Sequence, residues 1–328
     1  VISMKAGLLF ANGRAKAKEN NFISEERIRR MIESRSLNEA VRILFEINYA
    51  GGMMVDPNDF YTILHEEERL LYEFMREVTP KEMGLECFFL KADYHNLKVL
   101  CKEKYGNILD GEKILSHYGL IPLAKLKEQF KEISLDNPHM QEAFEYIDGL
   151  FEEGKGTPRV IDVTIDKAMF RDLKERLSER GVDKAVIEYF QVLTDSTNIL
   201  TFLRSVKIEA GYEFFESNFV EGGNLSLEFF KKLDGQKEKL EKELKGTVYK
   251  EFYDKASGVD LAIYEAEQDN YLIKLFATKK ADMLSAAPII GYYVGKLNEI
   301  KVIRVILVCK KNNVPKAEME KRVRQLYI

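Results

Sequence analysis

The sequence contains no tryptophan, few prolines and only three cysteines in 328 residues. Scarce proline together with abundant Glu, Lys and Leu favours helices, because proline breaks a helix interior. Cys87, Cys101 and Cys309 form neither a disulfide framework nor a CxxC pair. We expect them to be buried free thiols in a reducing compartment.

Long apolar segments are also absent. The longest nearly uncharged run, about 283–295, contains Pro288 and is shorter than the roughly 20 residues that span a bilayer as a helix. The first 20 residues lack a signal-peptide core of sufficient length. These observations lead us to expect a soluble, cytoplasmic protein.

Neither sign of charge dominates the chain. It has 50 basic and 54 acidic residues and a net charge of −4, which is too balanced for bulk electrostatic binding to nucleic acid or to a membrane. The alternating charges of 236–245 are typical of a solvated helix face. The length exceeds what one core usually holds and indicates two or three domains.

Nucleotide-binding chemistry has one weak candidate. Residues 149–157 nearly fit the phosphate-loop pattern GxxxxGK[ST], but Gly156 stands where the metal-binding hydroxyl belongs. Glu152 and Glu153 would lie against phosphate charge, and Pro158 follows where a helix is required. We interpret this segment as a linker.

The sequence also lacks motifs typical of metal sites and of catalytic sites. No histidine has a second ligand at the usual spacing except that Asp93 precedes His95 by two residues, which places them on different helical faces. The histidines are His65, His95, His117 and His139. We expect no catalytic residue, no cofactor and no metal site.

Hydrophobic periodicity predicts helices along most of the chain. Ser24 caps one helix, a second runs from Ser36 to Gly51, and others cover 60–78 and 86–106. A helix pair is expected between 119 and 153. Residues 162–166 are expected to form a short irregular or extended piece, with a few residues of strand near 159–165, followed by a helix capped by Asp166. The fold class is all-α.

A polar pair recurs along the chain. Asp93 and Asn96 share one face of the helix 86–106, and Asp195 and Asn198 repeat them 102 residues later. Glu299 follows Asp195 by 104 residues, with a valine, Val302, in the asparagine position. Helix starts near 23, 121 and 225 have nearly the same period, which predicts three repeated domains, 1–115, 116–220 and 221–328.

The repeated polar residues have two interpretations. One is a polar functional site; the other is a recurring helix crossing at which a short polar side chain meets a backbone group. Recurrence favours the structural interpretation, since a catalytic site is seldom kept in several copies. Five residues after the three acids stand Lys98, Leu200 and Arg304.

Several strings resemble one family. They are FANGRAKAKENNFISEERIRRMIES at 10–34, DYHNLKVLCKEKYG at 93–106, NEIKVIRVILVCKKNNVP at 298–315, and the closing Tyr327. Over nearly its whole length the chain resembles the C subunits of the archaeal and bacterial V-type ATPases, which are homologous to the d subunit of the vacuolar enzyme.

The resemblance implies three helical domains in a pseudo-threefold funnel. That funnel would cap the cytoplasmic face of the membrane rotor ring, receive the central shaft, and pass torque between the ATP-hydrolysing head and the ring that carries protons or sodium ions. It implies a non-catalytic component that is peripheral on the membrane and monomeric when isolated.

Within that picture we expect the repeated polar residues to line or brace the funnel interior, and the basic pair Lys98 and Arg304 to meet acidic residues of the shaft. The alternatives are a generic helical scaffold that binds a soluble protein partner, and an all-α enzyme whose site the sequence does not reveal.

Overall fold

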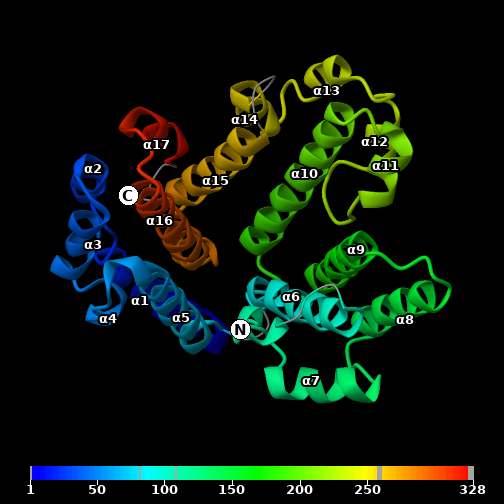
Figure 1. Cartoon of the computed structure of the whole chain (residues 1–328), viewed down its shortest axis with the longest axis horizontal. Helices are drawn as coiled ribbons and strands as arrows, with labels where there is room; N and C mark the ends of the chain where they lie inside the picture. The colour runs from blue at the N-terminus through cyan, green and yellow to red at the C-terminus, as the bar shows by residue number, and fades with distance from the viewer. Residues whose placement is uncertain (1, 81–82, 107, 109, 257–260, 324–328) are drawn as a thin grey trace. The chain divides into compact units, whose positions relative to one another are not determined.

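The computed structural model describes residues 2–80, 83–106, 108, 110–256 and 261–323. Every regular element within these ranges is a helix, which confirms the all-α fold class (Figure 1). The chain divides into two compact units, one made of residues 1–80 with 249–328 and the other of residues 81–248.

The first unit joins the two ends of the sequence. Its elements are α1 (Ile2–Glu19), α2 (Glu25–Glu33), α3 (Leu37–Glu46), α4 (Tyr49–Gly52), the 3₁₀ turn η1 (Pro57–Asp59), α5 (Phe60–Val78), α14 (Tyr249–Ala256), α15 (Leu261–Thr278), α16 (Ala287–Lys311) and α17 (Lys316–Arg322). Helix α16 is central to this unit, since it contacts α1, α2, α3, α5, α15 and α17.

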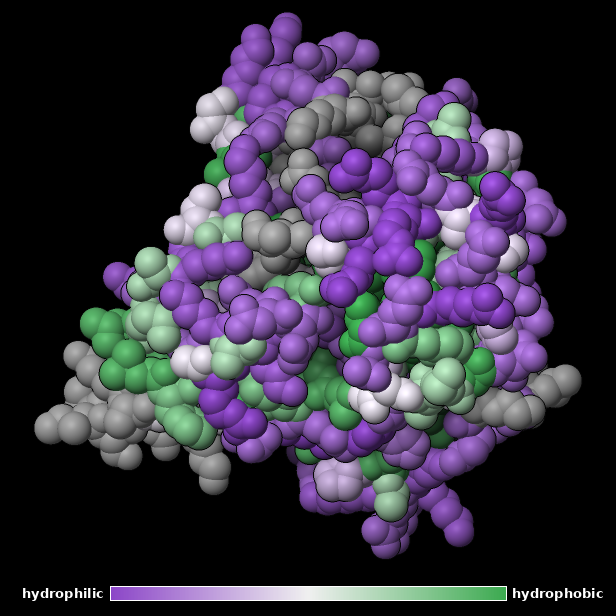
Figure 2. Space-filling view, turned by 90° about the vertical axis from the view of Figure 1, so that its left-hand side faces the viewer, coloured by the Kyte–Doolittle hydropathy of each residue, from purple (hydrophilic) through white to green (hydrophobic). Residues whose placement is uncertain are grey.

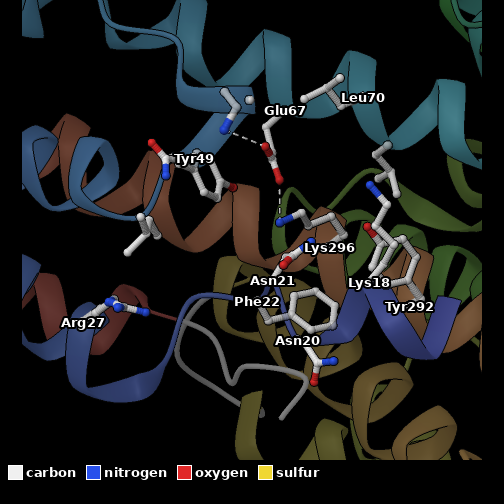
Figure 3. Close-up of a pocket in the computed structure, with 15 residues that line it drawn as sticks. Lys18, Asn20, Asn21, Phe22, Arg27, Tyr49, Glu67, Leu70, Tyr292 and Lys296 are labelled. Atoms are coloured by element: carbon white, nitrogen blue, oxygen red, sulfur yellow. Dashed lines mark hydrogen bonds and ion pairs between the residues drawn. The ribbon is translucent and has the colours of Figure 1, made fainter. Parts of the chain in front are cut away.

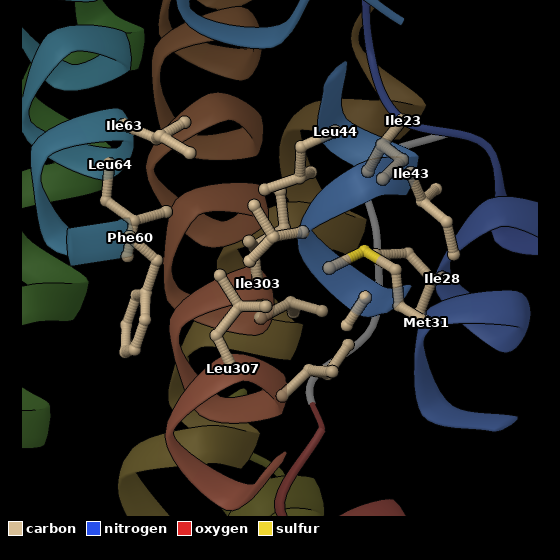
Figure 4. Packing of buried hydrophobic residues seen from close by; sticks show 14 of the residues in the cluster. Ile23, Ile28, Met31, Ile43, Leu44, Phe60, Ile63, Leu64, Ile303 and Leu307 are labelled. Carbon is tan, nitrogen blue, oxygen red and sulfur yellow. The ribbon is translucent and has the colours of Figure 1, made fainter. Parts of the chain in front are cut away.

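The core of this unit forms around the C-terminal half of α16. Ile303 and Leu307 lie between Phe60 and Leu64 of α5 on one side and the α2–α3 pair on the other (Figure 4). Ile303 and Leu307 are fully buried. Burial of such aliphatic side chains contributes about 1.5–3 kcal/mol each, so the packing holds the last long helix against the first helices of the chain.

The second unit is built around two further long helices. Its elements are α6 (Cys87–Lys104), the 3₁₀ turn η2 (Gly111–Ile114), α7 (Leu123–Glu132), α8 (Pro138–Glu152), α9 (Pro158–Leu177), α10 (Lys184–Lys207), α11 (Gly211–Asn218), α12 (Leu227–Lys231) and α13 (Lys237–Glu243). Helix α9 packs against both α6 and α8, and α10 packs against α11.

The helices that carry the repeated acids, α6, α10 and α16, are called the anchor helices below. Each one packs with helices that follow it in the next copy of the sequence pattern. Helix α6 contacts α7, α8 and α9, and Phe202 of α10 lies against Phe230 of α12 at 5.9 Å between ring centroids. Helix α16, in the last copy, contacts α2, α3 and α5 of the first. Each anchor helix therefore packs against helices that belong to another copy of the sequence pattern.

Most predicted helix boundaries are confirmed. The Ser24 hydroxyl accepts from the backbone N–H of Arg27 as an N-cap, and α5 and α6 lie where the periodicity predicts them. The second helix is shorter than expected because it ends at Glu46, and Asn48 next to it adopts a left-handed backbone with φ of 52°.

The extended piece predicted near 159–165 is wrong. Helix α9 already begins at Pro158, where the Thr157 side chain accepts from the backbone N–H of Val160. Asp166 therefore lies inside the helix and caps nothing. Thr157 followed by proline is a strong start signal, since proline at the first helical position sacrifices no intrahelical hydrogen bond.

Hydrophilic residues cover most of the face on which α2, α3 and α4 lie, and hydrophobic residues are exposed there in small groups (Figure 2). Of the helices within the described ranges, none combines the length and apolar character that crossing a bilayer demands. The three cysteines are free and buried.

Candidate functional site

Asp93 on α6 binds the backbone of the segment that leads into α7. Its Oδ2 accepts the N–H of Leu120 at 2.9 Å, and its Oδ1 accepts the N–H of Ile121 at 3.0 Å. The side chain is almost fully buried. A buried carboxylate requires such donors, because charge-assisted hydrogen bonds replace the water that it loses.

Asp195 on α10 repeats this arrangement in the next copy. Its Oδ2 accepts from Asn224 at 2.9 Å and its Oδ1 from Leu225 at 2.8 Å. In both copies a carboxylate in the middle of an anchor helix grips two consecutive backbone N–H groups nearly 30 residues ahead. We call each such set a clamp.

A glycine precedes the gripped residues in both clamps. A Cβ atom on Gly119 would lie 2.0 Å from Oδ1 of Asp93, and one on Gly223 would lie 2.0 Å from Oδ1 of Asp195. Any other residue would push the backbone off the carboxylate. These glycines are therefore part of the clamp, because only they allow this close approach.

The asparagines of the repeated pair bind backbone in a second way. Asn96 accepts the N–H of Ser116 at 2.7 Å and donates to the carbonyl of the same residue at 2.8 Å. Asn198 makes the same two bonds with Val220, at 3.0 and 2.8 Å. Each amide thus satisfies both polar groups of one residue, much as a neighbouring strand would.

The third clamp differs from the other two. Oε2 of Glu299 accepts the backbone N–H of Ile23 at 2.6 Å, and Oε1 accepts from the ammonium group of Lys296 at 2.7 Å. The gripped residue lies 276 positions earlier in the chain. Val302 takes the asparagine position and is fully buried. This clamp joins the last anchor helix to the first segment of the sequence.

Lys296 extends the third clamp into a buried ionic cluster. Its Nζ lies 2.5 Å from Oε1 of Glu67 on α5, and Figure 3 shows the two side chains pointing toward each other. The ammonium group also lies over the rings of Phe22 and Tyr49, 5.5 and 5.0 Å from their centroids. Glu67 in turn accepts the N–H of Ala50 at 2.9 Å. One cation therefore connects α5, α16, α4 and the segment that follows α1.

Burial and charge act in opposite directions in this cluster. Burial lowers the pKa of Lys296, but the carboxylates of Glu299 and Glu67 more than offset it, so that the pKa lies above its ordinary value of 10.5. Burial raises the pKa of Glu299, and the Lys296 ammonium only partly offsets this. Lys296 is therefore held as a charged ammonium.

A cavity of about 520 Å³ lies beside the cluster. Its wall includes Lys18, Arg27 and Lys296, together with the amides of Asn20 and Asn21 (Figure 3). The cavity wall thus offers hydrogen-bond donors from these side chains, and the carboxylate of Glu67 as an acceptor.

A second buried network was not anticipated from the sequence. Asp172 of α9 accepts from the Tyr94 hydroxyl at 2.8 Å, from the Asn137 amide at 2.7 Å and from Nε of Arg176 at 2.6 Å. It ties the anchor helix α6 to α9 and to the cap of α8. Burial raises the pKa of Tyr94, and the charge of Asp172 adds to this, so Tyr94 remains a donor.

The residues five positions after the acids lie in different surroundings. Lys98 pairs with Asp166 at 2.7 Å and lies 3.7 Å from Asp162, both on α9. Leu200 is buried. Arg304 is half-buried, and its Nε atom has no hydrogen-bond partner among the described residues. Lys98 thus has internal partners, whereas none is seen for Nε of Arg304 in the part of the chain that the structure describes.

The histidine and phosphate-loop candidates of the sequence lie in surroundings that explain them by structure. Nε2 of His95 lies 2.8 Å from the carbonyl oxygen of Ile114. The segment 149–157 runs from the end of α8 to the cap of α9, which places a helix before it where a phosphate loop requires a strand. Within the described ranges, no three His, Cys, Asp or Glu side chains gather as a metal site.

Comparison with known proteins agrees with the sequence resemblance. The family described as ATP synthase (C/AC39) subunit matches residues 11–322. The C subunit of the V-type sodium ATPase from Enterococcus hirae is 24% identical over 324 residues, which cover 95% of this chain and 96% of that protein. The C subunit of the A-type ATP synthase from Thermococcus onnurineus is 24% identical over 320 residues, which cover 90% of this chain and 84% of that protein.

The match spans all three clamps, from the N-terminal segment gripped by Glu299 to α16 itself. The fold is all-α, and the polar residues singled out by the repeat bind backbone. The chain therefore belongs to the ATP synthase (C/AC39) subunit family and is a non-catalytic stalk subunit of a rotary V/A-type ATPase.

Proposed function

We propose that this chain is the socket that couples the rotating central shaft of the ATPase to its membrane rotor ring. The observation that carries the proposal is the repeated clamp, in which three anchor helices each grip the backbone at the start of the next copy. A part that passes torque must resist deformation, and buried, fully satisfied polar networks rigidify a fold.

The proposal includes three equivalent domains, 1–115, 116–220 and 221–328, arranged as a funnel on the cytoplasmic face of the ring. The grip of Glu299 on Ile23 supports it, because the last copy then contacts the first as each earlier copy contacts the next. Such head-to-tail contacts can close into a ring of three. The isolated chain would be a monomer.

The residues Asp93, Asn96, Asp195, Asn198 and Glu299 brace this socket in our account. They act through backbone that they hold in place, since all five are buried and cannot reach a partner without opening the fold. Contact with the shaft falls to less buried cations. Arg304 is the stronger candidate, because it is half-buried and, unlike Lys98, forms no ion pair with a described residue.

Binding of the purified shaft subunits, measured by calorimetry, tests the proposal. We expect Arg304→Glu to weaken binding at least tenfold, since it opposes a carboxylate to the acidic residues expected on the shaft. Arg304→Lys should retain most of the affinity. Arg42→Glu, the same change at an exposed position on α3, is the matched control.

Lys98→Glu is a less specific variant, because it also breaks the ion pair with Asp166. Its shaft affinity is therefore compared with that of Asp166→Lys, which breaks the same pair and leaves Lys98 intact. Weaker shaft binding by Lys98→Glu alone supports contact with the shaft. Unchanged shaft affinity of both Arg304→Glu and Lys98→Glu would reject the role of the basic pair.

A further inference from the structure

A groove with a volume of about 660 Å³ lies along α9 in the second unit. Helix α8 forms one of its walls, and the C-terminal end of α11 forms part of the other; both helices pack against α9 (Figure 1). Its floor is apolar, with Ala143 from α8 and Val160 and Val163 from α9. The ring of Tyr146 at its edge is 58% exposed.

Three basic residues of α9 line the same groove. Arg159 stacks on the Phe214 ring of α11 at 4.3 Å, and Lys167 donates to the carbonyl of Ser217 at 3.1 Å. Arg171 follows one turn later. Glu142 is the acidic residue of the lining, and its carboxylate remains 3.9 Å from the Arg171 guanidinium. The groove therefore has a net positive charge.

Arg171 is incompletely paired. Its Nε atom is buried and has no hydrogen-bond partner among the described residues. A buried N–H of a cation without an acceptor is destabilising, because it has lost its water and gained no partner. A carboxylate supplied from outside the chain would satisfy it and would also face Lys167.

The spacing of the cations indicates the size of the ligand. Twelve residues separate Arg159 from Arg171, which corresponds to about 18 Å along a helix. A single phosphate group does not span that distance, whereas an amphipathic polypeptide segment does. Its apolar side chains would fill the floor beside Tyr146, an aromatic residue of the kind that dominates binding energy at protein interfaces.

We propose that this groove docks an acidic, amphipathic segment of another subunit of the ATPase, with carboxylates on Lys167 and Arg171 and apolar side chains on the floor. The inference rests on the family assignment and not on the socket role. The carboxylates of the segment would be complementary in charge to the groove. Such complementarity fixes the register of a bound segment and speeds its association.

Reconstitution of the complex from its purified subunits tests the proposal. The double variant Lys167→Glu/Arg171→Glu should join the complex with at least tenfold lower affinity, and Lys167→Gln/Arg171→Gln with a smaller loss. The control is Lys184→Glu/Lys232→Glu, which makes the same charge change at exposed positions of the second unit. Circular dichroism and thermal unfolding of each variant show that it is folded.

A photo-cross-linking residue, p-benzoylphenylalanine, in place of Thr164 on the groove floor identifies the segment by mass spectrometry. We expect a cross-linked peptide rich in Asp and Glu. Unchanged affinity of the folded variants, or a cross-linked peptide without carboxylates, overturns the proposal. Stabilisation of the wild type but not of the double variant by pyrophosphate, without any cross-link, would assign the groove to a small anion and would also overturn it.

The two proposals fail separately. If the wild-type chain binds neither shaft nor ring subunits, the socket role is wrong. If the wild type joins the complex and both groove variants join it equally well, only the groove inference is wrong.

Discussion

Oδ1 of Asp195 accepts the backbone N–H of Leu225 at 2.8 Å, although 30 residues of chain separate the two. The bond fixes the start of one copy of the repeat to the anchor helix of the copy before it. Asp93 does the same for Ile121, and Glu299 for Ile23. The arrangement predicts that loss of any one of these acids lowers the free energy of unfolding.

Replacing Asp195 with alanine should lower the free energy of unfolding of the second unit by about 2–4 kcal/mol, because it leaves two N–H groups without their acceptor in a buried place. Asp195→Asn should cost somewhat less, since the amide retains one acceptor oxygen. Urea denaturation followed by circular dichroism measures both. The control is Glu243→Gln, at an exposed position on α13. Its urea midpoint should equal that of the wild type within experimental error.

The two clamp glycines should be intolerant of alanine. Gly119→Ala and Gly223→Ala should each destabilise the protein by at least as much as loss of the acid, because the new Cβ atom would lie 2.0 Å from a carboxylate oxygen. The measurement is the urea midpoint.

Gly149→Ala provides the matched comparison. This glycine lies inside α8, and a Cβ atom added to it would have no atom within 4 Å outside the helix backbone. Alanine there should stabilise the protein, by up to about 1 kcal/mol from helix propensity. If alanine changes the urea midpoint equally at 119, 149 and 223, the close approach of the two clamp glycines to their acids does not exclude a side chain.

Lys296→Met should destabilise the first unit by about 3–5 kcal/mol, because it leaves Glu67 and Glu299 as uncompensated buried carboxylates. Adding Glu67→Gln and Glu299→Gln should recover a large part of that loss. Lys301→Met on the same helix, which breaks an exposed pair with Asp269, should cost about 1 kcal/mol or less. If Lys296→Met and Lys301→Met cost the same, the cluster is not the brace we describe.

The pKa of Lys296 predicts how this stabilisation depends on pH. A pKa above 10.5 in the folded state means that the folded protein holds the proton more tightly, so the contribution is complete below pH 10.5 and is lost as the pH rises through the folded-state pKa. The difference between the unfolding free energies of the wild type and Lys296→Met should therefore shrink above about pH 10.5.

The stability of Lys296→Met should also depend on pH in the acid range. A buried carboxylate paired with a cation loses its stabilising effect as the pH falls, and the variant should show the opposite trend. Without Lys296, burial of Glu299 is opposed by the backbone N–H of Ile23 but no longer by an ammonium group, so the pKa of Glu299 should rise further. The folded state then binds more protons than the unfolded state, so its stability should increase as the pH falls from neutral toward 4.5, the ordinary pKa of glutamate. A variant whose stability falls over that range would contradict this assignment of charges.

The repeat of polar residues was readable from sequence because its spacing is regular. Asp93 and Asn96 recur as Asp195 and Asn198 on helices whose period is itself clear. The gripped atoms were not readable, because a backbone N–H leaves no trace in residue identity. Gly119 and Gly223 were the available signal, since each stands two residues before a predicted helix start of the repeat.

The ionic cluster was missed for a different reason. Lys296 stands in a long apolar stretch of α16, where a single lysine resembles an ordinary surface position. Its partner Glu67 lies 229 residues earlier in sequence. Only the packing of α5 against α16 brings them together, and nothing local in either segment encodes that contact.

The start of α9 was misjudged because Asp166 resembled a helix cap. Asp166 precedes an apolar pattern, yet Ile161 and Ile165 are buried on the same face as Ala168. The periodicity thus continues upstream to Thr157 and Pro158. An apolar pattern followed back to its first member would have placed the cap correctly.

The central claim, that the chain links shaft to ring, is tested most directly by a bridging measurement. Detergent-solubilised rotor ring is immobilised, and retention of the purified shaft subunits is measured with and without this chain. We predict that the shaft is retained only when the chain is present, with one chain for each shaft. Equal retention of the shaft without the chain, or failure of the chain itself to bind the ring, would contradict the account.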